Sequence, residues 1–201
     1  MTKVANKVDL DTDGEWWMDA PNDRIYVYST TNPVTAGNTF EYAQRNNAIV
    51  AADKAYVTID GITAQYTNQS IISLTSTSTA ATNWTIQNCI LKGGWKQGIY
   101  ANGDSTHSFN SLNINNNTIS DIGGSSTTYF DGSLINIAYA DAISVYNNTL
   151  TMSSITGMHN YMGAIIHHHS YSRNDTGSVI HDNTISGTNP HPSSLPHALP
   201  P

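Results

Sequence analysis

The stretch INNNTIS, residues 114–120, sets three adjacent asparagines between two isoleucines, and close variants follow as VYNNTL at 145–150 and IHDNTI at 180–185. Each copy reads as an apolar residue, two polar residues, Asn, Thr and a second apolar residue. A segment this polar has little apolar surface to bury by itself. Its recurrence in a fixed order indicates an internal repeat, and a repeat determines the architecture of the whole chain.

Five segments align with this phrase when its first apolar residue is taken as an anchor. They are VTIDGITA (57–64), WTIQNCIL (84–91), LNINNNTI (112–119), ISVYNNTL (143–150) and SVIHDNTI (178–185). The anchors are Ile59, Ile86, Ile114, Val145 and Ile180, and five residues after them stand Ala64, Leu91, Ile119, Leu150 and Ile185. Most anchors also have an apolar residue two positions earlier, and this spacing predicts a strand with one buried face.

A second set of short apolar segments precedes the first. These segments are 47–53, 69–75, 97–103, 132–138 and 163–169, so each repeat is predicted to read strand, turn, strand, turn. The repeats are roughly 30 residues apart, a length that suits a solenoid in which each coil stacks on the last. A sandwich of hairpins would need periodic Asn-Gly or Asp-Gly turns, and the pairs that begin at residues 60, 102 and 131 are not periodic.

The repeated asparagine has a structural explanation in such a stack. Equivalent residues of neighbouring coils lie about 4.8 Å apart. Asn117, Asn148 and Asn183 all stand three positions after their anchors, so their side chains are predicted to form a hydrogen-bonded ladder. Asn also tolerates the left-handed backbone that a sharp turn needs.

Two further phrases carry a resemblance to a known family. YVTIDGIT (56–63) and GEWWMDAPNDRIYVYSTTNP (14–33) resemble the start of the coils, and the hairpin before them, in right-handed parallel β-helix proteins of the pectate-lyase-like group. The resemblance implies an all-β fold: a right-handed parallel β-helix of about five coils behind an N-terminal hairpin. The expected divisions are a leader and hairpin at 1–40, repeats at 41–188 and a Pro-rich irregular tail at 189–201, in a chain cut from a longer protein.

Charge and composition exclude several classes of protein. The net charge is −7, and Arg173 is the only Lys or Arg after Lys96. A nucleic-acid-binding protein needs a stripe of basic residues, which this chain lacks. A negatively charged polysaccharide would also need basic residues to bind it. The single Cys89 excludes an internal disulfide framework, and no apolar run is long enough for a membrane span. No signal peptide is visible, although the resemblance implies an extracellular or cell-surface protein.

Two motifs suggest a metal. Asp9, Asp11 and Asp13 match the first half of a calcium-binding EF-hand loop, but its twelfth position is Ala20, where a bidentate Glu is expected. The three histidines at 167–169 place two rings on one face of a strand without a third ligand that clearly joins them. A solvated acidic leader and stacked histidines are the simpler explanations. The sequence therefore predicts no cofactor, with calcium at Asp9, Asp11 and Asp13 as the alternative.

Polar and aromatic residues directly after the anchors are predicted to form an outward column. These residues are Asp60, Gln87, Asn115, Tyr146 and His181. Extended sugar chains commonly lie along such sheets in the family that the chain resembles, so this column is the candidate substrate-binding face. The alternative is the polar exterior that every solenoid has.

Catalytic residues are harder to assign. The Asn-Thr-Asp, Asp-Asp and Gly-His-Gly motifs of the family's hydrolases are absent, as is the acidic and basic set of its lyases. The longest excursions between strands put five residues forward as candidates: Asp131, Asp141, His159, His168 and Arg173. By resemblance, the function is that of an extracellular glycoside hydrolase or polysaccharide lyase. The alternative is a non-catalytic adhesin, surface or phage-fibre module that binds glycans.

Overall fold

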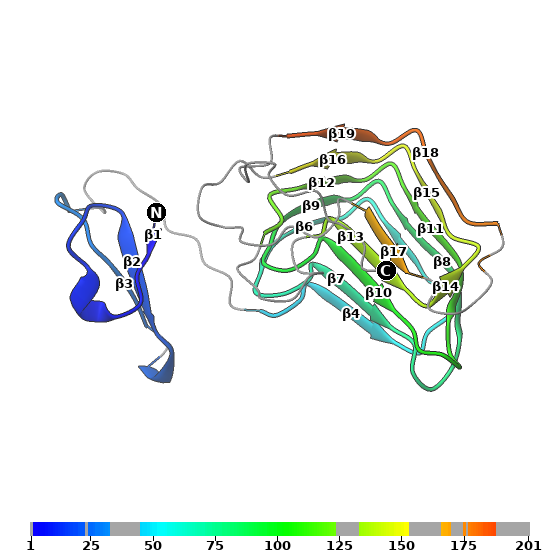
Figure 1. The fold of residues 1–201 in the computed structure, drawn as a ribbon, viewed down its shortest axis with the longest axis horizontal. Helices are drawn as coiled ribbons and strands as arrows, with labels where there is room; N and C mark the ends of the chain where they lie inside the picture. The colour runs from blue at the N-terminus through cyan, green and yellow to red at the C-terminus, as the bar shows by residue number, and fades with distance from the viewer. Residues whose placement is uncertain are drawn as a thin grey trace, which may run out of the picture. The chain divides into compact units, whose positions relative to one another are not determined.

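The computed structural model describes residues 2–22, 24–32, 45–123, 133–152, 166–169, 175 and 177–187. The chain divides into two compact units, Met1–Tyr42 and Ala43–Pro201 (Figure 1). The described residues form an all-β structure in which the only helical elements are two 3₁₀ turns of the first unit, η1 (Lys7–Asp9) and η2 (Ala20–Asn22). Residues 189–201, predicted to be an irregular tail, lie outside the described part.

The first unit is a three-stranded sheet. Strand β2 (Glu15–Asp19) pairs with β3 (Arg24–Val27) as the predicted antiparallel hairpin, and β1 (Thr2–Lys3) lies parallel to β2 on its other side. Aromatic side chains pair across the hairpin, with the ring centroids of Trp17 and Tyr26 5.7 Å apart. The Lys7 ammonium lies 3.7 Å from the centre of the Tyr26 ring, a cation–π contact.

The second unit contains three sheets in which every strand pair is parallel. Sheet I holds β4 (Ile49–Ala52), β7 (Ile72–Thr75), β10 (Ile99–Asn102), β13 (Ile135–Ala138) and β17 (Ile166–His169). Sheet II holds β5 (Thr58–Asp60), β8 (Ala81–Gln87), β11 (Phe109–Asn115), β15 (Ser144–Tyr146) and β18 (Val179–His181), with β14 (Ala140–Asp141) also on β11. Sheet III holds β6 (Thr63–Thr67), β9 (Ile90–Gly94), β12 (Thr118–Ser120), β16 (Thr149–Thr151) and β19 (Thr184–Ser186).

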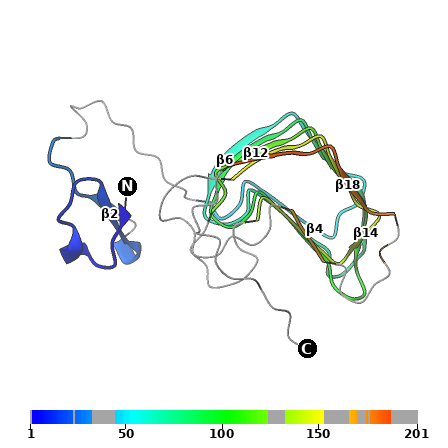
Figure 2. The same cartoon turned by 45° about the horizontal axis from the view of Figure 1, so that its top comes forward.

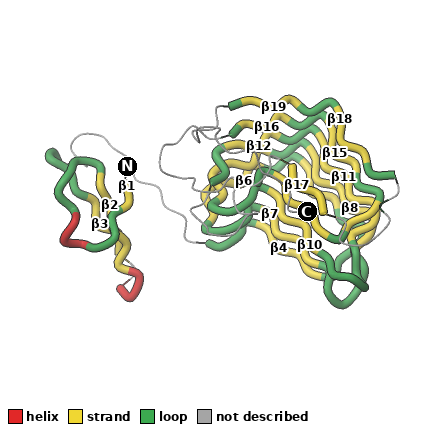
Figure 3. Tube along the Cα trace, in the orientation of Figure 1, coloured by secondary structure: helices red, strands yellow, loops and turns green. Residues whose placement is uncertain are grey.

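The chain visits the three sheets in rotation. One pass through sheets I, II and III is called a coil, and five coils follow one another from β4 to β19. In Figure 2 the successive coils overlap in projection, and Figure 3 shows the strands of each sheet stacked with loops at the corners. Parallel neighbours therefore come from positions one repeat apart in the sequence, as the alignment of the five segments predicts.

The prediction of two strands per repeat is wrong, because each coil has three. The sequence predicts one strand for each anchor segment, but in the structure that strand ends before the second residue after the anchor. The residues at the break all have positive φ: Gly61 (68°), Asn88 (55°), Asn116 (55°), Asn147 (55°) and Asp182 (51°). One left-handed residue bends the chain out of sheet II and into sheet III, and Gly, Asn and Asp adopt this conformation most readily.

The core is built from columns of apolar residues in register. Ile86, Ile114 and Val145 lie on adjacent strands of sheet II, and each is fully buried. Leu91, Ile119 and Leu150 form the corresponding buried column of sheet III. The same positions in the last coil are half exposed, at 50% for Ile180 and 54% for Ile185, because no further described strand pairs with β18 or β19.

The three asparagines stack inside the corner between sheets II and III. Asn117 Nδ2 donates to Asn148 Oδ1 at 3.0 Å, and Asn148 Nδ2 donates to Asn183 Oδ1 at 2.9 Å. Each Oδ1 also accepts a hydrogen bond from the backbone N–H of the preceding coil, as Asn148 Oδ1 does from Asn117 at 3.0 Å. Asn117 and Asn148 are each 1% exposed, so this ladder satisfies polar groups that water does not reach.

Cys89 occupies the ladder position of the second coil. Its N–H donates to Asn117 Oδ1 at 3.0 Å, and its thiol donates to the carbonyl of Gln87 at 3.0 Å. Burial raises the pKa of this thiol, so it stays protonated and able to donate. The thiol reaches the Ile59 carbonyl only at 3.9 Å, whereas the equivalent amide of Asn117 lies 2.9 Å from Ile86 O.

Replacing Cys89 with Asn is therefore expected to stabilise the protein. The new amide would extend the ladder by one coil, donating to Ile59 O and accepting from the N–H of Ile62. We expect a gain of about 1 kcal/mol in the free energy of unfolding, the net contribution of one to two good hydrogen bonds. Urea unfolding of Cys89→Asn beside Cys89→Ser measures this gain. An Asn variant no more stable than the Ser variant would contradict the role given to the ladder.

Candidate functional site

The outward column of sheet II forms one continuous row. Pairing of β5, β8, β11, β15 and β18 puts the five predicted residues directly in register: Asp60, Gln87, Asn115, Tyr146 and His181. They point away from the core because their neighbours at the anchor positions point into it. The parallel stacking of the coils thus brings together five side chains that are far apart in the sequence.

The first two residues of this row are locked together. Gln87 Nε2 donates to Asp60 Oδ2 at 2.8 Å, and Asn88 Nδ2 donates to Asp60 Oδ1 at 2.8 Å. The hydrogen bond from Asn88, and to a smaller extent the one from Gln87, holds the pKa of Asp60 below its ordinary value. The carboxylate is therefore ionised at neutral pH and fixes the orientation of the Gln87 amide.

Asn115 is the member of the row that does not reach the surface. It is only 4% exposed, and its Oδ1 accepts a hydrogen bond from Asn116 Nδ2 at 2.8 Å. It lies between longer side chains in register on both sides, Gln87 and Tyr146. Asn115 therefore keeps its predicted place in the row, but it is buried between its neighbours where the sequence predicts an outward side chain.

Tyr146 and His181 form an aromatic pair at the end of the row. Their ring centroids are 5.2 Å apart and the rings are almost parallel, at 2°. The rings stack on each other rather than lying flat on the sheet, so each covers one face of its neighbour. His181 Nδ1 also lies 2.8 Å from Asp182 Oδ2, which fixes the orientation of the imidazole. The pair therefore places a phenol and an imidazole side by side at the end of the row.

A second outward column runs beside the first and was not singled out from the sequence. Its members stand one residue before each anchor: Thr58, Thr85, Asn113, Ser144 and Val179. All are half-buried or exposed. Alternation along a strand puts them on the same face as the first column, so counting two residues back from each predicted contact would have found them.

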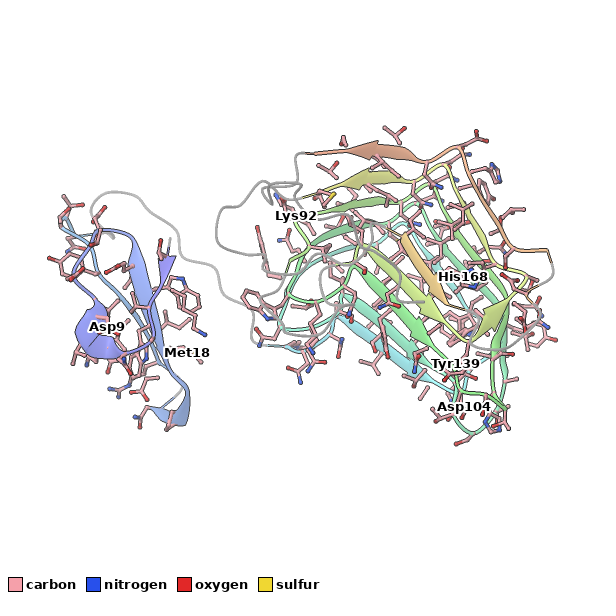
Figure 4. All side chains as sticks on the ribbon, viewed as in Figure 1. Asp9, Met18, Lys92, Asp104, Tyr139 and His168 are labelled. Atoms are coloured by element: carbon pink, nitrogen blue, oxygen red, sulfur yellow. The ribbon has the colours of Figure 1, made fainter. Side chains whose placement is uncertain are left out.

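Among the catalytic candidates, Asp131, His159 and Arg173 lie outside the described residues. Asp141 belongs to β14 and His168 to β17, and His168 is labelled in Figure 4. The His168 position continues an inward column of sheet I, in register with Ile137, and Nε2 of its ring lies 3.3 Å from Ala140 O. The ring therefore bridges sheet I to the strand that carries Asp141.

Two further side chains join His168. Its Nδ1 lies 3.6 Å from Asp175 Oδ2, and Ser178 Oγ donates a short hydrogen bond to the other oxygen of Asp175. His168 and Asp175 are 15% and 19% exposed. Both ring nitrogens thus face acceptors within the protein. Asp175 is one of the carboxylates that follow residue 100 in the sequence, but no local pattern there links it or Ser178 to His168, because the contact is tertiary.

The acidic leader does not form a shared site. Asp9 accepts hydrogen bonds from Asn6, Asp11 from Thr12, and Asp13 from the backbone and hydroxyl of Thr30. Each of the three candidate calcium ligands therefore accepts hydrogen bonds from a different residue. Within the described part of the chain, no group of three His, Cys, Asp or Glu side chains could hold a metal ion.

Several carboxylates act as turn caps instead. Asp104 is labelled in Figure 4. Its Oδ1 accepts hydrogen bonds from the backbone N–H groups of Thr106 at 2.8 Å and His107 at 2.7 Å. Asp53 Oδ1 likewise accepts from the N–H groups of Thr77 and Ser78, each at 2.8 Å. Hydrogen bonds from Thr106 and His107 hold the pKa of Asp104 well below its usual range, and those from Ser78 and Thr77 lower the pKa of Asp53.

These caps predict that acid destabilises the protein. Because both folded pKa values lie below the unfolded value of about 3.9, the stabilisation is complete above about pH 5 and is lost as pH falls through 4 towards the folded values. Thermal unfolding between pH 7 and pH 3 measures the loss. Asp104→Asn should be less stable than wild type at pH 7 and should show a shallower loss on acidification. An unchanged slope in this variant would contradict the role of the cap.

No protein-family model, curated protein or solved structure matches this chain. In the described residues, no helix is long and apolar enough to cross a membrane. The function must therefore be argued from the site itself.

Proposed function

We propose that this chain is a right-handed parallel β-helix of the pectate-lyase-like type, and that it binds an extracellular polysaccharide along the outward face of sheet II. Five coils that visit three parallel sheets in rotation support the β-helix. The right hand follows from the strong preference of parallel crossover connections for that hand. An extracellular or cell-surface location goes with the ligand, because extended polysaccharides of this kind lie outside the cell.

The row from Asp60 to His181 is the observation that carries the proposal. It offers a carboxylate, an amide, a phenol and an imidazole in register across five strands. The second column beside it adds hydroxyl and amide groups in its first four members and an apolar Val179 in the last. Sugar hydroxyls both donate and accept hydrogen bonds, and such mixed side chains can meet both needs. A row built on backbone pairing is also preorganised, which lowers the entropy lost on binding.

Cleavage of the glycan is the second candidate function. The observation that favours it is the ring of His168, held 3.6 Å from the Asp175 carboxylate beside the strand of Asp141. Hydrolysis needs two carboxyl groups placed about 5–10 Å apart across the scissile bond, and a histidine can serve as acid or base. The enclosed ring, with both nitrogens facing protein acceptors, makes binding the function that the geometry supports better.

A polysaccharide screen tests both functions at once. Affinity electrophoresis through a series of soluble polysaccharides measures retention of the protein, while new reducing ends and the ultraviolet absorbance of unsaturated ends measure cleavage. We expect retention by at least one polysaccharide without either product. Reducing ends alone would indicate a hydrolase, and unsaturated ends would indicate a lyase. Neither retention nor product would contradict the proposed function.

A further inference from the structure

The charges around sheet II bear on which class of polysaccharide it can bind. None of the six strands of this sheet contains a Lys or Arg. In the described part of the second unit, the Lys and Arg residues are Arg45, Lys54, Lys92 and Lys96, all of which precede strand β10 of the third coil. Lys92 belongs to sheet III, where its ammonium lies 3.5 Å from a carboxylate oxygen of Asp121. The strands of sheet II thus present no Lys or Arg to a ligand, and the imidazole of His181 at the end of the row already lies 2.8 Å from the Asp182 carboxylate.

Carboxylates, by contrast, stand at both ends of the outward row. Asp60 begins the row, and Asp182 follows His181 at its end and lies against that ring. Both are exposed. The hydrogen bonds from Asn88 and Gln87 keep the pKa of Asp60 low, so one end of the row is negative at all ordinary pH values. A chain of uronate residues laid along this row would bring like charges together at both ends.

Like charges that face each other across an interface cost binding energy, and proteins usually recognise carboxylates with Arg or Lys. Between the two carboxylates lie neutral donors and acceptors: the Gln87 amide, the Tyr146 phenol and the hydroxyls of Thr85 and Ser144. The imidazole of His181 also lies there, and its Nδ1 already faces the Asp182 carboxylate at 2.8 Å. Such groups match uncharged sugar hydroxyls and give no compensation for a sugar carboxylate. The row is therefore complementary to a neutral chain.

We infer that the ligand of sheet II is an uncharged polysaccharide and that the face rejects polyuronates. This inference rests on the proposed function and narrows its substrate class. It also runs against the acidic polymers that the family resemblance would suggest, because it follows from the side chains on this face. The discrimination between neutral polysaccharides and polyuronates is electrostatic, so it must weaken as the salt concentration rises.

The test compares a neutral glucan, mannan and galactan with polygalacturonate and alginate of similar chain length, at about 0.01 M and about 1 M salt. At low salt we expect at least tenfold tighter binding of the best neutral polymer than of either polyuronate. Added salt should leave the neutral affinity nearly unchanged and should raise the polyuronate affinity, because it screens repulsion. Removing one carboxylate with Asp60→Asn or Asp182→Asn should lower the ratio of neutral to polyuronate affinity at low salt.

The possible outcomes separate this inference from the proposed function. Polyuronate binding that equals or exceeds neutral binding, or that weakens as salt is added, would overturn the inference and leave glycan binding in place. A neutral polymer bound more tightly, with a ratio that falls in both Asp variants, supports it. No binding to any of the five polymers would overturn the proposed function and the inference together.

Discussion

Replacing Asn148 with Leu is expected to lower the free energy of unfolding by about 3–4 kcal/mol, because several buried polar groups lose their partner at once. Asn148 Oδ1 accepts from the backbone and side chain of Asn117, and its Nδ2 donates to Ile114 O and to Asn183 Oδ1. Leu has a similar size but can replace none of these bonds. Urea unfolding followed by circular dichroism measures the difference, and the melting temperature should fall by roughly 10 °C.

The neighbouring Asn147 provides the matched control. It is exposed and has a φ of 55°, so Gly can take its place without strain. Asn147→Gly should change stability by less than about 0.5 kcal/mol, as for most surface substitutions. If Asn148→Leu costs no more than this control, the amide ladder does not hold the corner between sheets II and III.

Replacing Tyr146 with Ala is expected to weaken polysaccharide binding at least tenfold. The change removes the phenol from the exposed row and leaves His181 without the ring that stacks on it at 5.2 Å. Tenfold corresponds to about 1.4 kcal/mol, within the range for loss of an aromatic contact and a hydrogen bond. Titration calorimetry with the polysaccharide retained most strongly in the screen measures the affinity.

Two control variants separate the effect of the Tyr146 ring from that of its hydroxyl, and the effect of sheet II from that of sheet III. Tyr146→Phe keeps the stacked pair and removes only the hydroxyl, so its affinity should lie between those of wild type and Tyr146→Ala. Thr149→Ala changes an exposed outward residue of sheet III and should leave binding unchanged. Equal losses in Tyr146→Ala and Thr149→Ala would mean that sheet II is not the binding face.

Much of the strand stacking could be predicted from the sequence because apolar columns repeat with fixed offsets. Ile86, Ile114 and Val145 align from the letters alone, and the structure places them in register on sheet II. The error of two strands per coil arose at Asn88 and its equivalents. The segment looked continuous, and only the left-handed backbone at that residue separates sheet II from sheet III.

Less of the candidate site than of the fold could be predicted from the sequence. Alternation correctly placed Asp60 and Tyr146 on one outward row, since side-chain direction follows from strand position alone. Burial of Asn115 could not be predicted in this way, because it depends on the length of its neighbours in the coils before and after it. The contact between His168 and Asp175 is tertiary, and no local sequence pattern pairs these two residues.

The most direct test of the central claim, binding along the outward face of sheet II, is a map of the residues that a bound oligosaccharide touches. Chemical-shift changes of side-chain and backbone signals, followed during titration with a fragment of the retained polysaccharide, provide that map. We predict that the largest changes fall on Gln87, Tyr146 and His181 and that the sheet III residues Thr149 and Thr184 remain unaffected. Changes concentrated on sheet III, or in the first unit, would contradict the account.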